Sequence, residues 1–565
     1  MTKKTFSTLL YALTFSIGSV CAQTIGTSPV KIPMLLSANF GELRSNHFHS
    51  GIDIKIQGKV GLPLYSFDDG YISRISVSST GYGKALYITH PNGYTTVYGH
   101  MDGFFDEAAE YLKKYQYENK TFEANLYLPE NKISVRKGQF IGYGGNTGSS
   151  FGPHLHFEIR DTKTEEALNP FAFTAKYLTD THPPQIREIM IVPLNNAGVA
   201  GGSYSKKKYP LVTDKKTGIK SIAEEMTAWG EIGLAVMAND YMNDVSNIFG
   251  VYDISLKVDD VQLFGSRMDK FSFDETRYIN SFIDYEEYGK NNAFYMRSYV
   301  EPGNKLGIYT KLINGGIINI KEERDYKLTY TLTDYFGNRT FFDFVIQGKK
   351  EESIPRIEEG ETIRMFYDRE NKYVTNSIEF TIPEGYLYSD LNFKSNIKNS
   401  MECISPVYVL HERNVVPLHG YCPLKIKVPA NMLSDISKYY IAAITGNRKT
   451  YCKSEYKNGW FETQIRNFGD YAVVSDFTPP VIAPLLPKKW GINGKINCKI
   501  SDKDSGIKSY LAEIDGKFFL LEYDAKNNLL SGNLDASQIR KDAEHVFRLV
   551  VTDNCGNKAE YMYII

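Results

Sequence analysis

The chain has 565 residues and a formal net charge of −1, with 66 acidic and 65 basic side chains. This length is too great for one hydrophobic core and predicts roughly three to four domains. The balanced charge gives no general attraction to nucleic acid or to an anionic membrane surface, so neither partner is expected. Aromatic residues make up 13% of the chain. They favour β-sheets, because pleated surfaces accept aromatic and β-branched side chains.

The first residues have the composition of an export signal. A short basic start precedes a mostly apolar run from Leu9 to Val20, and Val20-Cys21-Ala22 resembles a signal cleavage site. The run is short for a bilayer span. We therefore expect cleavage after Ala22, no integral membrane segment after signal removal, and a location in the periplasm, the cell envelope or outside the cell. A lipid anchor on Cys21 is the alternative, although Val20 is larger than the residue usual there.

Between residues 32 and 173 the sequence predicts short strands separated by glycine turns. Residues 85–90 and 94–98 flank a Pro-Asn-Gly turn, which is typical of a hairpin. A further strand is expected at 154–160, where the residues alternate. One helix is predicted at 105–117, because apolar residues recur there at three- and four-residue steps.

An internal repeat appears after residue 181. Gly250–Asp259 matches Gly506–Asp515 in its spacing, and Thr333–Asn338 matches Thr552–Asn557. Each closing Asp-x-x-Gly-Asn predicts a tight turn between strands, because Gly and Asn tolerate positive φ. Both copies resemble immunoglobulin-like β-sandwiches, and the first has a long insertion between Phe264 and Lys305.

These patterns predict an all-β, mainly antiparallel protein of several domains. The expected division is an export signal at 1–22, a first β-domain at 23–178, an immunoglobulin-like sandwich with the insertion at 179–350, a further β-rich domain at 351–476 and a second immunoglobulin-like sandwich at 477–565. The boundaries rest on two Pro-Pro pairs and on a charged run at 349–352.

Five cysteines remain once the signal is removed. They are Cys403, Cys422, Cys452, Cys498 and Cys555. An exported compartment permits at most two disulfides among them, and the sequence leaves the pairing open. No pair has the CxxC spacing of a zinc knuckle, so packing is expected rather than catalysis.

Histidines cluster in the first β-domain. His49-Ser-Gly-Ile-Asp53 and His154-Leu-His156 supply imidazoles and a carboxylate, the side chains that hold a catalytic zinc ion and leave one coordination position open. In a strand, residues two or four apart face the same side. We therefore expect His49, Asp53 and His156 to bind one Zn²⁺, with His154 beside them.

Three motifs together carry a resemblance to a known family. His-x-Gly-x-Asp at 49–53, Tyr-Gly-His at 98–100 and Gly-Pro-His-Leu-His-Phe-Glu at 152–158 resemble, in this order, lysostaphin/LytM-type zinc endopeptidases. The resemblance covers roughly a quarter of the chain. It implies a small antiparallel β-domain that cleaves peptide bonds of bacterial peptidoglycan. It also implies one zinc ion on the three ligands above, with His100 and His154 near the metal-bound water.

The physical chemistry agrees with these implied roles. Zinc lowers the pKa of a bound water toward ~7 and polarises the scissile carbonyl. His100 and His154 are the candidates to orient or deprotonate that water, to hydrogen-bond the oxyanion and to return a proton to the leaving amine. The sequence leaves open which of them is the base.

Neighbouring residues have alternative interpretations. His47 is an alternative metal ligand, or otherwise a groove-wall or solvated residue. Arg44 pairs with a substrate carboxylate or is an ordinary surface charge. His90 is expected to be structural. Glu158 alternates with His156 and therefore shares its face, where it is a candidate to contact that ligand.

The stretch between His100 and His154 is longer than in the resembled family. The extra residues, 103–131, include the predicted helix. They either wall the substrate groove or form a passive surface excursion.

The leading hypothesis is an exported zinc metalloendopeptidase acting on peptidoglycan peptides, with C-terminal β-domains that bind the envelope. One alternative is a catalytically silent LytM-like activator of another wall hydrolase, although no ligand is missing here. The other is an envelope adhesion or scaffold protein, since sandwich folds host many binding functions. A chain truncated after about Leu178 is predicted to retain activity on soluble peptides and to act more weakly on intact walls.

Overall fold

The computed structural model describes residues 26–195, 197–216, 218, 220–350, 361–534, 540 and 543–565. The expected export signal, with its cleavage site after Ala22, lies outside the described residues. Within the described ranges no helix has the length and apolarity needed to cross a membrane. Strands dominate and pair mainly antiparallel, which confirms the all-β prediction.

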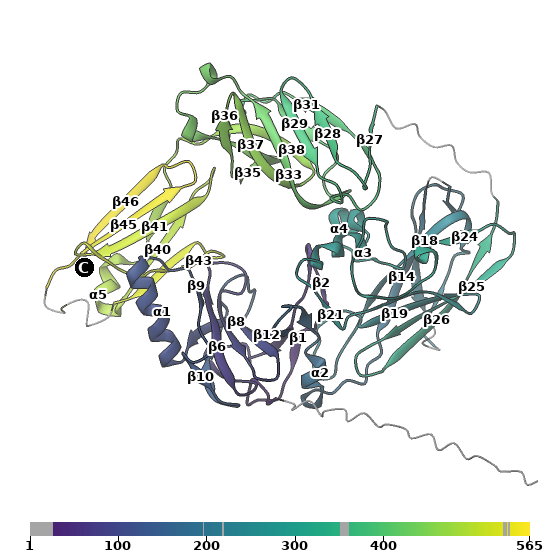
Figure 1. Ribbon diagram of the computed structural model, residues 1–565, viewed down its shortest axis with the longest axis horizontal. Coiled ribbons are helices and arrows are strands. Elements are labelled where there is room, and N and C mark those ends of the chain that lie inside the picture. The colour runs from purple at the N-terminus through teal and green to yellow at the C-terminus, as the bar shows by residue number, and fades with distance from the viewer. Residues whose placement is uncertain are drawn as a thin grey trace, which may run out of the picture.

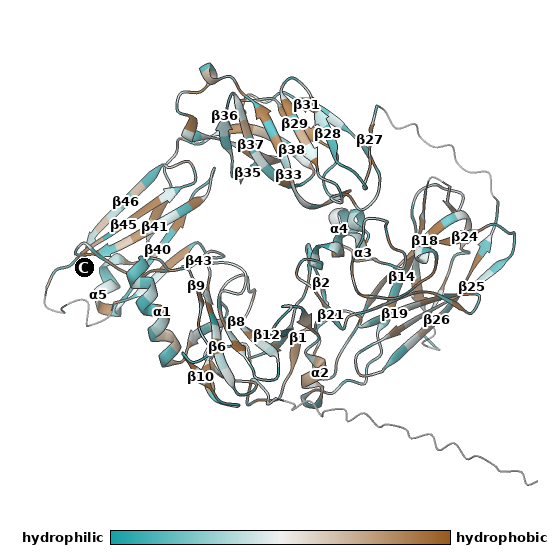
Figure 2. Ribbon diagram, in the orientation of Figure 1, coloured by the Kyte–Doolittle hydropathy of each residue, from teal (hydrophilic) through white to brown (hydrophobic). Residues whose placement is uncertain are grey.

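Four groups of strands follow one another around a ring (Figure 1). We call them the first unit (26–178), the second unit (179–350), the third unit (361–476) and the fourth unit (477–565). The fourth unit, coloured yellow, lies beside the first unit, coloured purple, so that the path of the chain closes. Figure 2 shows hydrophobic residues along the strands of all four units, interleaved with hydrophilic ones. Most of the buried hydrophobic side chains belong to four large clusters, one in each unit.

The first unit is a twelve-stranded sheet. Its strands are β1 (Leu36–Ala38), β4 (Ile52–Lys55), β5 (Leu62–Tyr65), β6 (Gly70–Val77), β7 (Lys84–Thr89), β8 (Tyr94–Phe104), β9 (Ala124–Tyr127), β10 (Ser134–Val135), β11 (Phe140–Gly144), β12 (His154–Asp161), β13 (Ala167–Leu168) and, from the second unit, β21 (Lys270–Phe271). The main path runs β1-β4-β12-β8-β7-β6-β10. Outside this sheet lie β2 (Leu43–Arg44), β3 (His47–Phe48), α1 (Asp106–Asn119), α2 (Phe171–Thr174) and η1 (Ala175–Tyr177).

The elements predicted for this unit are present. Strands β7 and β8 form the expected hairpin across the Pro-Asn-Gly turn. Strand β12 begins at His154 and runs antiparallel between β4 and β8. Helix α1 starts and ends within two residues of the predicted limits and buries Ala108 and Leu112. Its hydrophobic spacing was therefore a reliable signal.

The second unit is also twelve-stranded, in the order β17-β16-β14-β18-β26-β25-β19-β20-β23 with three strands attached. Its strands are β14 (Gln185–Pro193), β15 (Val199–Ala200), β16 (Lys207–Thr213), β17 (Lys220–Ile222), β18 (Thr227–Asn239), β19 (Asp253–Val258), β20 (Val261–Arg267), β22 (Met296–Arg297), β23 (Tyr309–Leu312), β24 (Ile318–Ile320), β25 (Asp325–Thr333) and β26 (Arg339–Gly348). Its helices are η2 (Thr276–Tyr278), α3 (Ile279–Phe282), α4 (Tyr285–Asn291) and η3 (Asn314–Gly316). The pairing of β18 with β26 is parallel.

The third unit consists of two five-stranded sheets, β28-β29-β33-β37-β36 and β31-β32-β38-β34-β35, and the pair β27-β30. Its elements are β27 (Ile363–Met365), β28 (Asn371–Val374), β29 (Ile378–Ile382), β30 (Leu391–Phe393), β31 (Ser395–Lys398), β32 (Val407–Leu410), β33 (Pro417–Lys427), η4 (Ala430–Met432), η5 (Ile436–Lys438), β34 (Tyr439–Thr445), β35 (Arg448–Cys452), β36 (Glu455–Lys457), β37 (Trp460–Asn467) and β38 (Gly469–Ser475).

The fourth unit has two four-stranded sheets, β39-β40-β44-β43 and β42-β41-β45-β46. Its elements are β39 (Val481–Pro484), η6 (Pro487–Lys489), α5 (Trp490–Asn493), β40 (Lys495–Ser501), β41 (Ile507–Ile514), β42 (Lys517–Phe518), β43 (Glu522–Asp524), β44 (Leu529–Asn533), β45 (Val546–Asp553) and β46 (Lys558–Ile564). The internal repeat has a structural counterpart, because β19 pairs with β25 and β25 with β26, as β41 pairs with β45 and β45 with β46. In each copy the Asp-x-x-Gly-Asn segment turns between the last two strands, as predicted.

The first and second units share packing. Strand β21, inside the predicted insertion, pairs with β13. The Phe271 ring contacts those of Phe40 and Phe48, with centroids 4.9 and 5.5 Å apart. Phe40 and Phe48 are only 3% and 1% exposed. Truncation after Leu178 would uncover them, so the structure argues against the expectation that the first unit acts alone.

The fourth unit closes the ring by contacting the first. Lys84 Nζ lies 2.9 Å from Glu522 Oε1. Lys526 Nζ donates to the carbonyls of Ser150, at 3.1 Å, and of Asn146. Helix α1 also faces this unit, where the Tyr117 and Phe518 rings meet with centroids 5.5 Å apart.

All five cysteines are free thiols. Cys422 and Cys498 are buried in the cores of the third and fourth units. Cys555 packs with Tyr440 and Val474 across the junction between these two units. Their role in the structure is packing.

Candidate metal centre and active site

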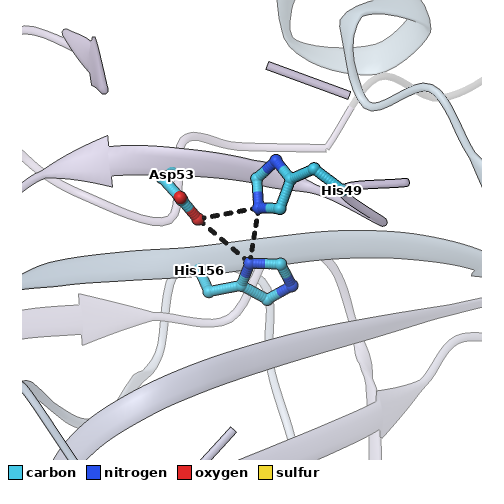
Figure 3. A group of neighbouring side chains, drawn as sticks. All are labelled: His49, Asp53 and His156. Carbon is cyan, nitrogen blue, oxygen red and sulfur yellow. Dashed lines mark hydrogen bonds and ion pairs between the residues drawn. The ribbon is translucent and has the colours of Figure 1, made fainter. Parts of the chain in front are cut away.

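Three side chains converge between the ends of neighbouring strands. His49 follows β3, Asp53 lies in β4, and His156 lies directly opposite Asp53 in β12. His49 Nε2, Asp53 Oδ1 and His156 Nδ1 are 3.0 Å from one another (Figure 3). All three residues are buried. The structure thus brings together the three ligands that the sequence motifs predicted.

The hydrogen bonds of the other ring nitrogens of His49 and His156 show which nitrogen of each ring has a free lone pair. His49 Nδ1 donates to the carbonyl of Asn39 at 2.7 Å, and His156 Nε2 donates to Glu158 Oε1 at 2.8 Å. In a neutral imidazole the other nitrogen is then an acceptor. With both rings neutral, as metal binding requires, two such acceptors and a carboxylate oxygen point at one another, and a cation satisfies all three.

The spacing suits zinc. Donors at ~2.0–2.1 Å in tetrahedral geometry are ~3.3–3.4 Å apart, within a few tenths of an ångström of the 3.0 Å found here. Two imidazoles and one carboxylate form a three-ligand set that leaves one tetrahedral position for water or substrate. The residues present therefore fit a zinc ion.

The local charges favour a cation at this place. Burial opposes protonation of His156, but hydrogen bonds to Asp53 and Glu158 outweigh it and raise its pKa to about 9. Burial also acts to raise the pKa of Asp53, yet the neighbouring histidines hold it well below its usual range. A positive charge is thus stabilised beside an ionised carboxylate.

Glu158 fixes the orientation of His156 from behind. It is fully buried and accepts hydrogen bonds from His156, Ser50 and Tyr82. Arg160 Nη2 lies 2.6 Å from its second oxygen. Burial works against its ionisation, but Arg160 and His156 hold its pKa below the usual range. The alternation of residues along the strand predicts that Glu158 shares the face of His156, and the structure shows which residues contact it.

His100 and His154 lie beside this centre with ring centroids 4.8 Å apart. His100 Nδ1 donates to the carbonyl of Thr147 at 2.9 Å, and His154 Nδ1 donates to that of Gly152 at 2.8 Å. His154 Nε2 is 3.5 Å from Asp53 Oδ1. Burial, reinforced by the neighbouring His156 and His154, lowers the pKa of His100 to about 3. His100 is therefore neutral at pH 7, with its proton on Nδ1 and a lone pair on Nε2.

The backbone at His100 is unusual. Its φ of 57° lies in the left-handed region, which few residues other than Gly, Asn, Asp and His adopt. Its N–H donates to the carbonyl of Tyr82 at 2.8 Å. Strain of this kind is maintained by the surrounding structure and is common at functional sites.

Comparison with known proteins agrees with this geometry. Residues 47–117 and 106–170 match the model of peptidase family M23. The chain contains an M23 peptidase domain. This confirms the resemblance seen in the motifs, and the M23 domain is the main part of the first unit. Residues 362–476 match a Zu5-like domain, within the third unit.

Curated relatives match about a fifth to a quarter of the chain. The DD-carboxypeptidase/endopeptidase Mpg of Neisseria meningitidis serogroup B is 34% identical over 118 residues, which are 21% of this chain and 21% of that protein. The peptidoglycan DD-endopeptidase ShyA of Vibrio cholerae is 30% identical over 138 residues, 23% of this chain and 26% of that protein. The matches thus span between a fifth and about a quarter of these relatives.

Some solved structures match a similar share of the chain. The catalytic domain of lysostaphin from Staphylococcus simulans is 21% identical and covers 25% of this chain and 92% of its own, with a TM-score of 0.20. A zinc-containing peptidase from Vibrio cholerae is 27% identical and covers 23% of this chain and 35% of its own, with a TM-score of 0.18.

The candidate metal centre of the M23 domain opens into a cavity of about 1380 Å³. Arg44 and His47 line it, together with the three candidate ligands, His100 and His154. Asn247, Phe273 and Thr276 of the second unit also line it, and no local sequence signal had indicated them. No residue of the 103–131 stretch is among the lining residues. The structure therefore places this stretch against the fourth unit and does not support a groove wall.

The other residues weighed from sequence have clear places. Arg44 Nη2 lies 3.7 Å from Asp53 Oδ2 and 3.2 Å from Glu42 Oε1, at the edge of the centre. His47 is exposed and bonds the carbonyl of Ser45, outside the converging set. His90 is buried and bonds Asp69 and Thr96, a structural arrangement.

The loop that positions His100 depends on Gly148. Its φ is +69°, and a Cβ there would meet the backbone nitrogen of Gly83 at 2.3 Å. Gly148→Ala is expected to destabilise by ~1–2 kcal/mol from the backbone conformation and by a further ~1–3 kcal/mol from the clash. Gly138→Ala is the matched control, because Gly138 has φ +70° and its Cβ would meet only Thr27, at 3.9 Å. If the two variants had equal free energies of unfolding, the close approach of Gly148 to the Gly83 backbone would not contribute to stability.

Glu158→Gln is expected to weaken zinc binding by ~10–100-fold, because the variant loses the charge that orients His156 and leaves Arg160 buried without its counter-ion. Competition with a chromogenic chelator measures the affinity. Glu130→Gln, at an exposed position of the same unit, serves as the control. A Glu158 variant that binds zinc as tightly as the unaltered chain would refute the orienting role.

Proposed function

We propose that the chain is an exported zinc metalloendopeptidase that hydrolyses peptide bonds of peptidoglycan, in a stem peptide or a cross-link. The observation that carries the proposal is the convergence of His49, Asp53 and His156 within an M23 domain. Relatives named peptidoglycan DD-endopeptidase suggest the substrate class. In this proposal one zinc ion is bound per catalytic domain.

His49, Asp53 and His156 would hold the zinc ion. When bound, zinc supplies an acidified water and a Lewis acid for the scissile carbonyl. His100 is assigned to accept the proton of the attacking water at Nε2, since Nδ1 donates to the Thr147 carbonyl and leaves the lone pair on Nε2.

His154 and Glu158 support this step in different ways. His154, beside His100, would hydrogen-bond the developing oxyanion as an imidazolium, with Nδ1 donating to Gly152 and Nε2 to the oxyanion. Glu158 holds the ring of His156 in place through Nε2. The proton taken up by His100 then passes to the leaving amine, so that hydrolysis ends with the site in its starting protonation state.

The C-terminal units are proposed to hold the enzyme at the envelope. The second unit already contributes Asn247, Phe273 and Thr276 to the cavity wall, so the units beyond the M23 domain shape access to the site.

The proposal is tested by mass spectrometry of fragments released from purified peptidoglycan by the zinc-loaded full chain. Cross-linked muropeptides should decrease and peptide-cleaved products should appear, while glycan strands stay intact. A chain that holds one zinc ion per molecule and leaves the peptidoglycan unchanged would overturn the proposal. That result would favour a silent activator of another hydrolase, or an adhesion or scaffold protein.

A further inference from the structure

Three aspartates meet where the first unit joins the second. Asp180 lies in the connection between η1 and β14, Asp240 follows β18, and Asp334 follows β25. One carboxylate oxygen from each lies within 4.8 Å of the others. The three residues are 9%, 4% and 2% exposed, respectively. Three acidic groups buried this closely repel one another unless protons or a cation neutralise them.

Asp240 lacks the partner that a buried carboxylate needs. Its Oδ1 is buried and has no hydrogen-bond partner among the described residues. An unsatisfied buried carboxylate oxygen carries a large desolvation cost. Burial and the neighbouring Asp180 and Asp334 raise the pKa of Asp240 to about 8. A cation bound here would supply the missing partner and keep Asp240 ionised.

The surrounding contacts orient the other two carboxylates without neutralising them. Asp334 accepts hydrogen bonds from the backbone and side-chain nitrogens of Asn338, at 2.8 and 2.6 Å. Asp180 Oδ1 accepts from the backbone N–H of His182 at 2.9 Å. In the described part of the chain no Lys or Arg forms an ion pair with any of the three aspartates. Each carboxylate therefore keeps oxygen lone pairs for a further ligand.

The same arrangement recurs at the junction of the third and fourth units. Asp476, Asp502 and Asp553 bring their oxygens within 4.8 Å of one another. Asn557 bonds Asp553 as Asn338 bonds Asp334, in the second copy of the Asp-x-x-Gly-Asn turn. Both clusters thus lie where one unit joins the next. Only the first cluster has a buried carboxylate oxygen without a partner among the described residues, that of Asp240.

We propose that Asp180, Asp240 and Asp334 bind a divalent cation of the calcium class, which ties the connection after the M23 domain to two strand ends of the second unit. The donors are all oxygens, which hard cations prefer. Ca²⁺ accepts carboxylates in flexible geometry, whereas zinc favours imidazole and thiolate ligands. The bound ion supplies the charge that Asp240 lacks and fixes the angle between the two units.

The test uses the zinc-loaded full chain in buffer freed of calcium by a chelating resin. Calorimetric titration with CaCl₂ should show binding, and the thermal unfolding midpoint should rise by about 2–4 °C at saturating calcium. In Asp240→Asn the number of calcium ions bound per chain should fall by one, whether or not the second cluster also binds. MgCl₂ should bind more weakly, because Mg²⁺ dehydrates reluctantly and demands octahedral geometry.

Asp244→Asn is the matched control, since Asp244 is an exposed aspartate four residues away whose left-handed φ suits Asn. It should bind as many calcium ions as the unaltered chain. Asp240→Asn should fold at least as well without calcium, because it removes repulsion among the carboxylates, and Asp334→Asn provides a second variant. Absence of calcium binding in the unaltered chain, or an unchanged stoichiometry in both cluster variants, would overturn the proposal.

Discussion

His156→Ala should abolish peptide cleavage and reduce the zinc content from about one ion per chain to a level near zero. His156 supplies one of the three donor atoms and lies 3.0 Å from the other two. A two-donor site cannot hold zinc in the tetrahedral geometry that catalysis requires. We expect turnover to fall by on the order of 10³-fold or more. Zinc is measured by elemental analysis after dialysis, and turnover by release of muropeptides.

His47→Ala is the control for this variant. His47 lines the same cavity but is exposed and outside the converging set. It should retain zinc and most of the activity. If His47→Ala lost zinc while His156→Ala retained it, the ligand assignment would be wrong. Unfolding curves of the metal-free forms separate loss of zinc from loss of the fold.

His100→Asn should leave zinc in place and lower kcat by ~10²–10⁴-fold, the usual contribution of a positioned acid or base. Asn is the appropriate replacement, because it tolerates the left-handed backbone found at His100 better than Ala does. The KM should change little, since the proposed role of His100 is proton transfer and not binding.

The zinc content decides how the His100 result is interpreted. A variant that has lost both zinc and activity would make His100 part of the metal centre and contradict its assignment as proton acceptor. A variant with full zinc and unchanged kcat would show that another residue accepts the proton. His154→Asn would then test whether that residue is His154. His182→Asn, at an exposed position of the second unit, controls for replacing a histidine by Asn.

Local periodicity accounts for what the sequence predicted well. His154, His156 and Glu158 alternate along β12, and register then places His156 opposite Asp53. Helix α1 and the hairpin of β7 and β8 follow from spacing and turn chemistry in the same way. The alternation along β12, the helix and the hairpin need only a few consecutive residues to be specified.

Contacts between segments that are distant in the sequence could not be predicted. Phe273 and Thr276 reach the cavity because an insertion in the second unit folds back on the M23 domain, which no short pattern encodes. The position of α1 against the fourth unit has the same origin. Asp334 stood in a recognised turn motif, but its neighbours Asp180 and Asp240 become visible only once three separate segments are packed together.

The closed path of the four units makes the molecule a mechanical loop. The first unit is joined to the second through β13 and β21, and to the fourth through Lys84 with Glu522 and through Lys526. In such a linkage no hinge turns independently, because a rotation at one joint must be matched at the others. Lys526 Nζ donates to the carbonyl of Asn146, next to Thr147, whose own carbonyl accepts a hydrogen bond from His100 Nδ1. The contact that closes the loop of units therefore lies one residue from the carbonyl that holds His100.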